Sequence, residues 1–120
     1  MTRLDELEAF ELAMEYEDQP AEAVVSWALD LFHPHVALAW SGQAEDMVIL
    51  DMAWRINPDV RAFAVDTGRM HEETYALMEE VRQKYGIAIE VVFPDRHEIE
   101  AMVRNFGVNL MYRDVAYRIL

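Results

Sequence analysis

Three short apolar segments alternate with two helical segments, and this order constrains the fold more than any other feature. The apolar segments are residues 36–40, 60–65 and 87–93, and the helical patterns cover residues 45–56 and 72–85. Strand, helix, strand, helix, strand predicts a right-handed βαβαβ unit. Such a unit is half of a doubly wound parallel sheet. The first apolar segment lacks polar alternation, so we expect a parallel strand that is covered on both faces.

The helices between and after these strands have recognisable ends. Residues 45–56 are nearly all apolar, which predicts a mostly buried helix. Gly86 follows the second helix where a C-cap glycine is expected. Asp95, with Glu98 three residues later, resembles a capping box that opens a third helix, and Gly107 ends it. A short last helix is expected at about residues 109–120.

Two helices are expected before the first strand. Leu4, Leu7, Phe10 and Met14 recur at helical spacing, so residues 1–19 are predicted to form an acidic amphipathic helix. Pro20 suits the first turn of the next helix. We therefore divide the chain into an acidic N-terminal helix, 1–19, and a truncated α/β domain, 20–120. The acids of the first helix form either a solvated face or a docking surface for a partner.

The composition and the net charge of the chain argue against several classes of function. The 120 residues are 53% hydrophobic and fit one small domain with a real core. A net charge of −13 argues against nucleic-acid binding, although a locally positive pocket can still take a small anion. No apolar run approaches the ~18–20 residues that span a membrane. The N-terminus is acidic where a signal peptide is basic and then apolar, so we expect a cytoplasmic protein with no membrane contact.

The chain contains no cysteine, which excludes disulfides, thiolate metal ligands and cysteine nucleophiles within these residues. The four histidines, His33, His35, His71 and His97, show no metal-ligand spacing. We therefore predict no metal site and no catalytic residue in this chain.

Two polar turns follow the first two strands. In an open parallel sheet, ligands bind at the carboxyl ends of the strands, so turns at that edge suggest a nucleotide pocket. The first turn leads into a helix N-terminus, where N–H groups favour a phosphate or sulfate. Its residues are Ser41, Gly42, Gln43, Ala44, Glu45 and Asp46. Serine and glycine also serve as ordinary turn residues, and the two acids as first-turn residues that stabilise the helix dipole.

The second turn contains Asp66, Thr67, Gly68 and Arg69. Arg69 is a candidate for contact with a phosphate or is an ordinary surface arginine. Asp66 and Thr67 are candidates for the nucleotide site, or they simply cap the next helix.

Four sequence motifs that occur in a fixed order are more specific than either turn taken alone. They are Ser-Gly-x-Ala-Glu-Asp from Ser41, Ile-Asn-Pro from Ile56, Asp-Thr-Gly-Arg-Met-His-x-Glu-Thr-Tyr from Asp66, and Lys-Tyr-Gly-Ile from Lys84. Together they resemble the N-terminal part of the assimilatory adenylyl-sulfate (APS) and phosphoadenylyl-sulfate (PAPS) reductases, over residues 21–120. The resemblance implies an adenine nucleotide alpha hydrolase-like fold: three parallel strands with flanking helices, preceded by two helices. It also implies a role in sulfate assimilation.

The resemblance also implies a site. The first turn, residues 41–46, is expected to hold the phosphosulfate, and Asp66, Thr67 and Gly68, with Arg69, to line the nucleotide site for APS, PAPS or AMP. Gln43 stands where relatives have glycine or a shorter turn, and Glu72 stands where they have proline.

The cysteines of the family are missing from these 120 residues. In APS-type members, a cysteine pair that binds an iron–sulfur cluster follows this stretch, and a later cysteine attacks the sulfur. A 4Fe-4S cluster and thioredoxin are therefore expected only for a form with a cysteine-bearing continuation. Reduction through a thiosulfonate needs a thiolate, so we expect this chain alone not to reduce APS or PAPS.

Half of a doubly wound sheet leaves the first strand with an unpaired edge, which favours self-association or docking to another chain. Two alternatives to the reductase-like function stay open. One is an ATP-dependent adenylating enzyme of the same superfamily, whose loop is usually Ser-Gly-Gly-x-Asp-Ser. The other is a non-catalytic interaction module that uses the acidic helices or the open edge.

Overall fold

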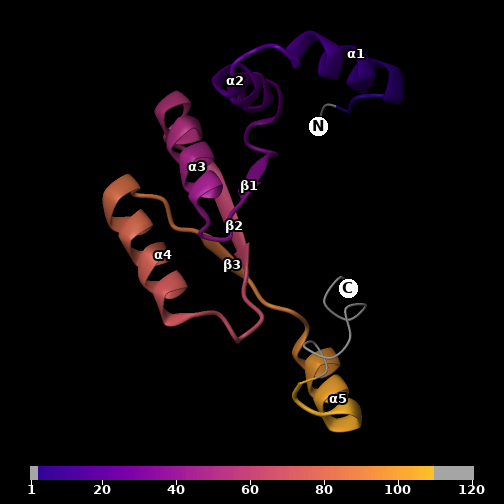
Figure 1. Cartoon of the computed structure of the whole chain (residues 1–120), viewed down its shortest axis with the longest axis vertical. Coiled ribbons are helices and arrows are strands. Elements are labelled where there is room, and N and C mark those ends of the chain that lie inside the picture. Colours follow the sequence, from indigo (N-terminus) through magenta and orange to yellow (C-terminus); the bar gives the residue numbers. More distant parts are fainter. Residues whose placement is uncertain (1–2, 110–120) are drawn as a thin grey trace.

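The computed structural model describes residues 3–109 and contains a small parallel sheet with helices before, between and after its strands (Figure 1). The elements in chain order are α1 (Glu6–Tyr16), α2 (Ala21–Phe32), β1 (Ala37–Ala39), α3 (Ala44–Ile56), β2 (Arg61–Val65), α4 (Glu72–Tyr85), β3 (Glu90–Val92) and α5 (Arg96–Phe106). The strands are shorter than the sequence predicts, and the predicted last helix lies outside the described residues.

The three strands pair in parallel in the order β1-β2-β3, which confirms the predicted arrangement. Ala39 lies opposite Phe63, and Phe63 lies opposite Glu90. Within the described residues β2 is therefore central, and β1 pairs on one side only. The carboxyl ends of β1 and β2 meet at the same edge of the sheet.

Both crossover helices, α3 and α4, lie on the same side of the sheet (Figure 1). Two right-handed crossovers that run in the same direction along a sheet must do this. Ala62 and Ala64 of β2 face these helices and are buried, and Leu50 of α3 and Val81 of α4 close over them. The remaining buried apolar residues of this core are Leu29, Trp40, Ala53, Val60 and Ile87.

The opposite face of the sheet is open within the described residues, so the expectation of a first strand covered on both faces is wrong here. Ala37 and Ala39 of β1 are exposed, and Val65 of β2 is 57% exposed. Side chains alternate between faces along a strand, so one covering layer buries only every second residue. An ion pair between Arg61 and Glu90, at 3.0 Å, joins β2 to β3 on this open face.

The expectation of a mostly buried α3 is also wrong. Only Leu50 and Ala53 of this helix are buried, and Val48 is 54% exposed. The helix packs against the sheet on one side and contacts α2, but no described layer covers the rest of its apolar surface. An apolar sequence shows that a helix can be buried, whereas the number of layers around it decides how much is buried.

The predicted glycine caps at Gly86 and Gly107 are confirmed, whereas the predicted capping box at Asp95 and Glu98 forms only in part. Asp5 and Glu8 form a capping box that opens α1, and the Asp95 side chain accepts a hydrogen bond from the backbone N–H of Glu98. Gly86 adopts the left-handed conformation, with φ of 69°, that a C-cap requires. Pro20 is the N-cap of α2 and not part of its first turn. No helix within residues 3–109 is long and apolar enough to cross a membrane.

Candidate functional site

A cavity of about 600 Å³ lies at the carboxyl ends of β1 and β2, where the sequence places both polar turns. Ser41 and Asp46 of the first turn and Arg69 of the second line it. Residues of both turns therefore line one cavity, and their role in binding a ligand stays a prediction. The other lining residues are Ala39, Trp40, Phe63, Ala64, Val65, Met70, His71 and Thr74.

The carboxylate of Asp46 holds the first turn in place. Asp46 is the third residue of α3, and one of its oxygens accepts hydrogen bonds from the backbone N–H of Ser41, at 2.8 Å, and from the Ser41 hydroxyl, at 2.5 Å. The hydroxyl bond, followed by the backbone bond, lowers the pKa of Asp46 below its usual value. The turn is therefore tied to the helix that follows it. Asp46 also stabilises the α3 dipole, as the sequence suggested.

Gly42 allows the turn to pass close to a buried tryptophan. Its φ is 81°, in the left-handed region, and a Cβ at this position would lie 3.3 Å from the Trp40 ring. Trp40 is only 3% exposed, and its indole N–H donates to the sulfur of Met47 at 3.3 Å. Both the backbone conformation and the space beside this fixed ring therefore favour glycine.

Asp66 organises the second turn. It is the one buried charged side chain of the described residues, at 4% exposed. Its carboxylate accepts from the backbone N–H of Gly68 at 2.7 Å and from the Tyr75 hydroxyl at 2.8 and 2.9 Å. The carboxylate raises the pKa of Tyr75, since it stabilises the protonated hydroxyl. The bond to Tyr75 ties the turn to α4.

The alternative in which Asp66 and Thr67 cap the next helix is wrong. The N-cap of α4 is His71, which makes no side-chain capping bond, and Thr67 is exposed. Four residues separate Thr67 from the start of α4, so the turn and the helix cap are distinct. The Asp66 carboxylate caps its own turn through the N–H two residues on.

Seven of the ten residues predicted for the site do not line the cavity. Gly42, Gln43, Ala44, Glu45, Asp66, Thr67 and Gly68 shape the two turns or stand beside them. Eight residues that line the cavity were not predicted from the sequence: Ala39, Trp40, Phe63, Ala64, Val65, Met70, His71 and Thr74. Three of them, Met70, His71 and Thr74, follow Arg69 in the motif that begins at Asp66. The length of that motif was the sequence signal that could have indicated them. Phe63 is placed by the strand pairing.

Within residues 3–109 no group of histidine, aspartate and glutamate side chains has the arrangement of a metal site. The polar groups in the cavity wall are instead a serine, an aspartate, an arginine, a histidine and a threonine. With the first turn of α3 beside them, these groups are of the kind that bind anions and hydroxyls.

Comparison of this chain with known proteins finds one matching family and several relatives. The model of the phosphoadenosine phosphosulfate reductase domain family matches residues 35–119. An adenosine 5′-phosphosulfate reductase of Pseudomonas aeruginosa (strain LESB58) is 41% identical over 86% of this chain and 38% of its own length. A chloroplastic 5′-adenylylsulfate reductase 3 of Arabidopsis thaliana is 41% identical over 91% of this chain and 24% of its own length. The chain thus spans well under half of these curated relatives.

A solved structure has a fold similar to that of this chain. The crystal structure of a phosphoadenylyl-sulfate (PAPS) reductase from Candida auris, in complex with phosphate, matches 97% of this chain and 57% of its own chain, with a TM-score of 0.77. Sequence identity in this match is 22%, so it supports the fold alone.

The two hydrogen bonds from Ser41 to Asp46 generate a prediction about pH. In a carbon NMR titration, the Asp46 carboxylate is expected to titrate below 3.8, the usual pKa of an aspartate. The variant Ser41→Ala removes the hydroxyl bond and keeps the backbone bond, so the pKa should rise toward that value. Ser26→Ala, on α2, should leave it unchanged. An equal pKa in wild type and Ser41→Ala would contradict the proposed role of the hydroxyl.

The sign of the stability effect follows from the direction of this shift. Because folding lowers the pKa of Asp46, its contribution to stability is present above the unfolded-state pKa and is lost as the pH falls through the folded-state value. Ser41→Ala should therefore reduce the dependence of stability on pH in this acidic range.

The buried carboxylate of Asp66 generates a second prediction. Asp66→Ala leaves the Gly68 N–H and the Tyr75 hydroxyl without their acceptor, so it should cost about 1–3 kcal/mol in urea unfolding. The neighbouring variant Thr67→Ala, on an exposed side chain, should stay within about 0.5 kcal/mol of wild type. Asp66→Ala should also lower the pKa of Tyr75, followed by ultraviolet absorbance. Equal stability of the two variants would show that Asp66 does not hold the turn.

Proposed function

The chain belongs to the phosphoadenosine phosphosulfate reductase domain family, and we propose that residues 20–120 are the nucleotide-binding part of an adenylyl-sulfate or phosphoadenylyl-sulfate reductase of sulfate assimilation. The observation that carries the proposal is the cavity at the carboxyl ends of β1 and β2, which Ser41, Asp46 and Arg69 line together. Its ligand is an adenine nucleotide: APS, PAPS or the product AMP.

The first turn is the proposed site of the phosphosulfate. Asp46 accepts both donors of Ser41 and keeps its negative charge, so the positive groups of the site must outweigh it. The first N–H groups of α3 have no acceptor within the helix and carry the positive end of its dipole. Arg69, which also lines the cavity, adds a guanidinium, a group that binds phosphate oxygens. These N–H groups and Arg69 are the proposed source of attraction for an anion in a chain of net charge −13.

The apolar part of the cavity is the proposed site of the adenosine. Ala39, Phe63, Val65 and Met70 line it, and three of these come from the exposed face of the sheet. Aromatic and aliphatic walls with a few polar groups are typical of sites that bind a heterocyclic base. We propose that Thr67 and Gly68, although outside the cavity wall, shape the second turn around the nucleotide.

The reductive chemistry must be supplied from outside these residues. Reduction of the sulfur takes two electrons, and a thiolate is the nucleophile that attacks it in the proposed reaction. The 120 residues contain no cysteine, so they offer neither this nucleophile nor ligands for an iron–sulfur cluster, and we assign no step to such a cluster. Thioredoxin is proposed as a partner only for a form that carries the cysteine. A cytoplasmic location belongs to the same proposal.

The edge of β1 is the proposed site of self-association or of docking to another chain. Among the described residues β1 pairs only with β2, which leaves the backbone groups of its other edge available to a further strand.

Nucleotide binding tests the proposal. Calorimetry with AMP and with APS should show binding to the wild-type chain. Arg69→Ala should weaken the binding of APS by about ten- to a hundredfold, because it removes charge-assisted hydrogen bonds to the phosphosulfate. Arg55→Ala is the matched control, because it removes the same charge from α3 on a residue paired with Asp51 outside the cavity. This control should bind APS as wild type does.

Three different results would contradict this proposal or a part of it. A folded chain that binds neither AMP nor APS would favour the non-catalytic interaction module. Tighter binding of ATP than of APS would favour an adenylating enzyme. Equal losses in Arg69→Ala and Arg55→Ala would remove Arg69 from the site.

Self-association generates its own prediction. Sedimentation velocity over a series of concentrations should show the wild-type chain forming larger species as concentration rises. Ala37→Lys places a charge on the exposed edge strand, outside the nucleotide cavity, and should shift the chain toward the monomer. A wild-type chain that stays monomeric at every concentration would contradict the proposal.

A further inference from the structure

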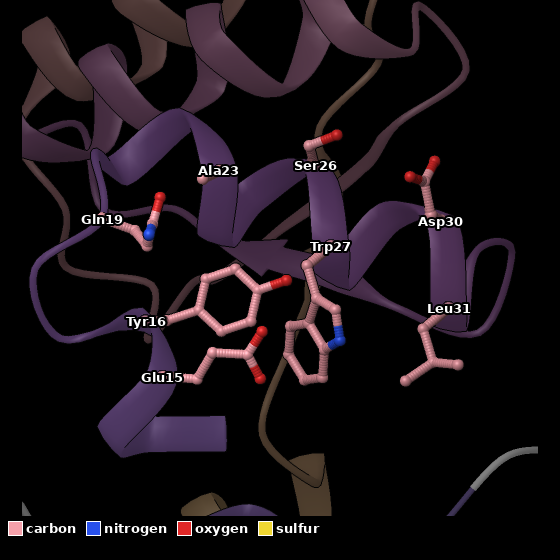
Figure 2. A pocket seen from close by; sticks show the side chains of 8 residues that line it. All are labelled: Glu15, Tyr16, Gln19, Ala23, Ser26, Trp27, Asp30 and Leu31. Atoms are coloured by element: carbon pink, nitrogen blue, oxygen red, sulfur yellow. The ribbon is translucent and has the colours of Figure 1, made fainter. Parts of the chain in front are cut away.

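A second hollow lies in the angle between α1 and α2. The residues that line it precede in the sequence all those that line the nucleotide cavity. This hollow measures about 620 Å³ and shares no lining residue with the nucleotide cavity. Figure 2 shows the side chains of Tyr16 and Glu15, at the end of α1, and Trp27, on α2, converging in this angle. The other lining residues are Gln19, Ala23, Ser26, Asp30 and Leu31.

Two aromatic rings form the floor of this hollow. The ring centroids of Tyr16 and Trp27 lie 5.9 Å apart, and Phe32 packs edge-on against Trp27 at 5.7 Å. Phe32 thus supports the indole from the side of α2. A carboxylate, Glu15, stands beside these rings (Figure 2). Aromatic faces next to a carboxylate are the arrangement that attracts a lysine or arginine side chain.

The hollow continues along α1. An adjoining hollow of about 410 Å³ shares Glu15 and Leu31 with the first and is further lined by Arg3, Leu4, Glu8, Glu11 and Leu12. We name the two together the α1–α2 groove. Glu8, Glu11 and Glu15 are spaced three and four residues apart, so they share one face of α1. Arg3 is the one basic residue among the groove residues.

The groove combines this negative charge with apolar surface. No residue of α1 is buried, and Leu31 of α2 is 37% exposed. Leucine side chains along a row of carboxylates match a polypeptide segment in which basic and apolar residues alternate. A nucleic acid does not match, because its phosphates meet the same carboxylates.

We propose that the α1–α2 groove is a docking site for a basic, partly apolar polypeptide segment of a partner protein. An arginine or lysine of the segment lies over the rings of Tyr16 and Trp27 beside Glu15, and its apolar residues contact Leu12 and Leu31. The site is separate from the nucleotide cavity and independent of the proposed reductase function.

Fluorescence anisotropy with a defined peptide tests this proposal. The probe is a fluorescein-labelled peptide of alternating arginine and leucine pairs, and its control is a peptide of equal length and charge with serine in place of leucine. The full chain should bind the arginine–leucine peptide more tightly than the arginine–serine peptide. Binding should weaken as salt is added. Equal binding of the two peptides, or no binding, would overturn the proposal.

Matched variants separate the groove from the general negative charge of the chain. Glu11→Gln with Glu15→Gln should weaken binding of the arginine–leucine peptide by about tenfold, from the loss of two ion pairs. Glu73→Gln with Glu80→Gln removes the same charge from exposed positions on α4 and should weaken it by less than about threefold. Equal losses in the two double variants would overturn the proposal.

A substitution of Trp27 tests the role of the aromatic rings in the groove. Trp27→Leu keeps an apolar side chain but removes the ring, and should weaken binding by about threefold or more. Helix content by circular dichroism and the midpoint of urea unfolding serve as folding controls for each variant. A Trp27→Leu chain that passes the folding control and binds the peptide as wild type does would overturn the role given to the rings.

Discussion

The parallel pairing of β2 with β1 and β3 is the constraint on which the rest of the structure depends. Parallel strands require crossover connections, and right-handed crossovers place α3 and α4 on one face of the sheet. The same pairing brings the carboxyl ends of β1 and β2 to one edge. Ser41 and Arg69, which are far apart in the sequence, meet at one cavity for this reason.

Two carboxylates play parallel roles at that edge. Asp46 ties the first turn to α3 through Ser41, and Asp66 ties the second turn to α4 through Tyr75. In each case an acid that looks like a candidate for chemistry is engaged in positioning a turn. Asp46 stays ionised at the cavity wall, so the proposed anion site depends on the N–H groups of α3 and on Arg69.

Among the described residues, the core leaves one face of the sheet and the surface of α1 uncovered. The face of the sheet opposite α3 and α4 is open within residues 3–109, and Val65 and Val92 are at least half exposed on it. At the other end, α1 buries none of its residues and borders an acidic groove with an aromatic floor. Within residues 3–109, the cavity at the carboxyl ends of β1 and β2 is thus separate from the two surfaces that we propose for contacts with polypeptides.

The sequence by itself determined the order of strands and helices, the glycines that end α4 and α5, and the two polar turns that follow β1 and β2. These depend on local patterns: apolar runs, caps and turn residues within a few positions of one another. Only the tertiary structure decided that α3 is half exposed, that Asp66 bonds to Tyr75 and not to the start of a helix, and that Phe63 and Thr74 line the cavity. Burial and cavity walls depend on which elements pack on which face, and an apolar residue has the same pattern along the chain whether or not a second layer covers it.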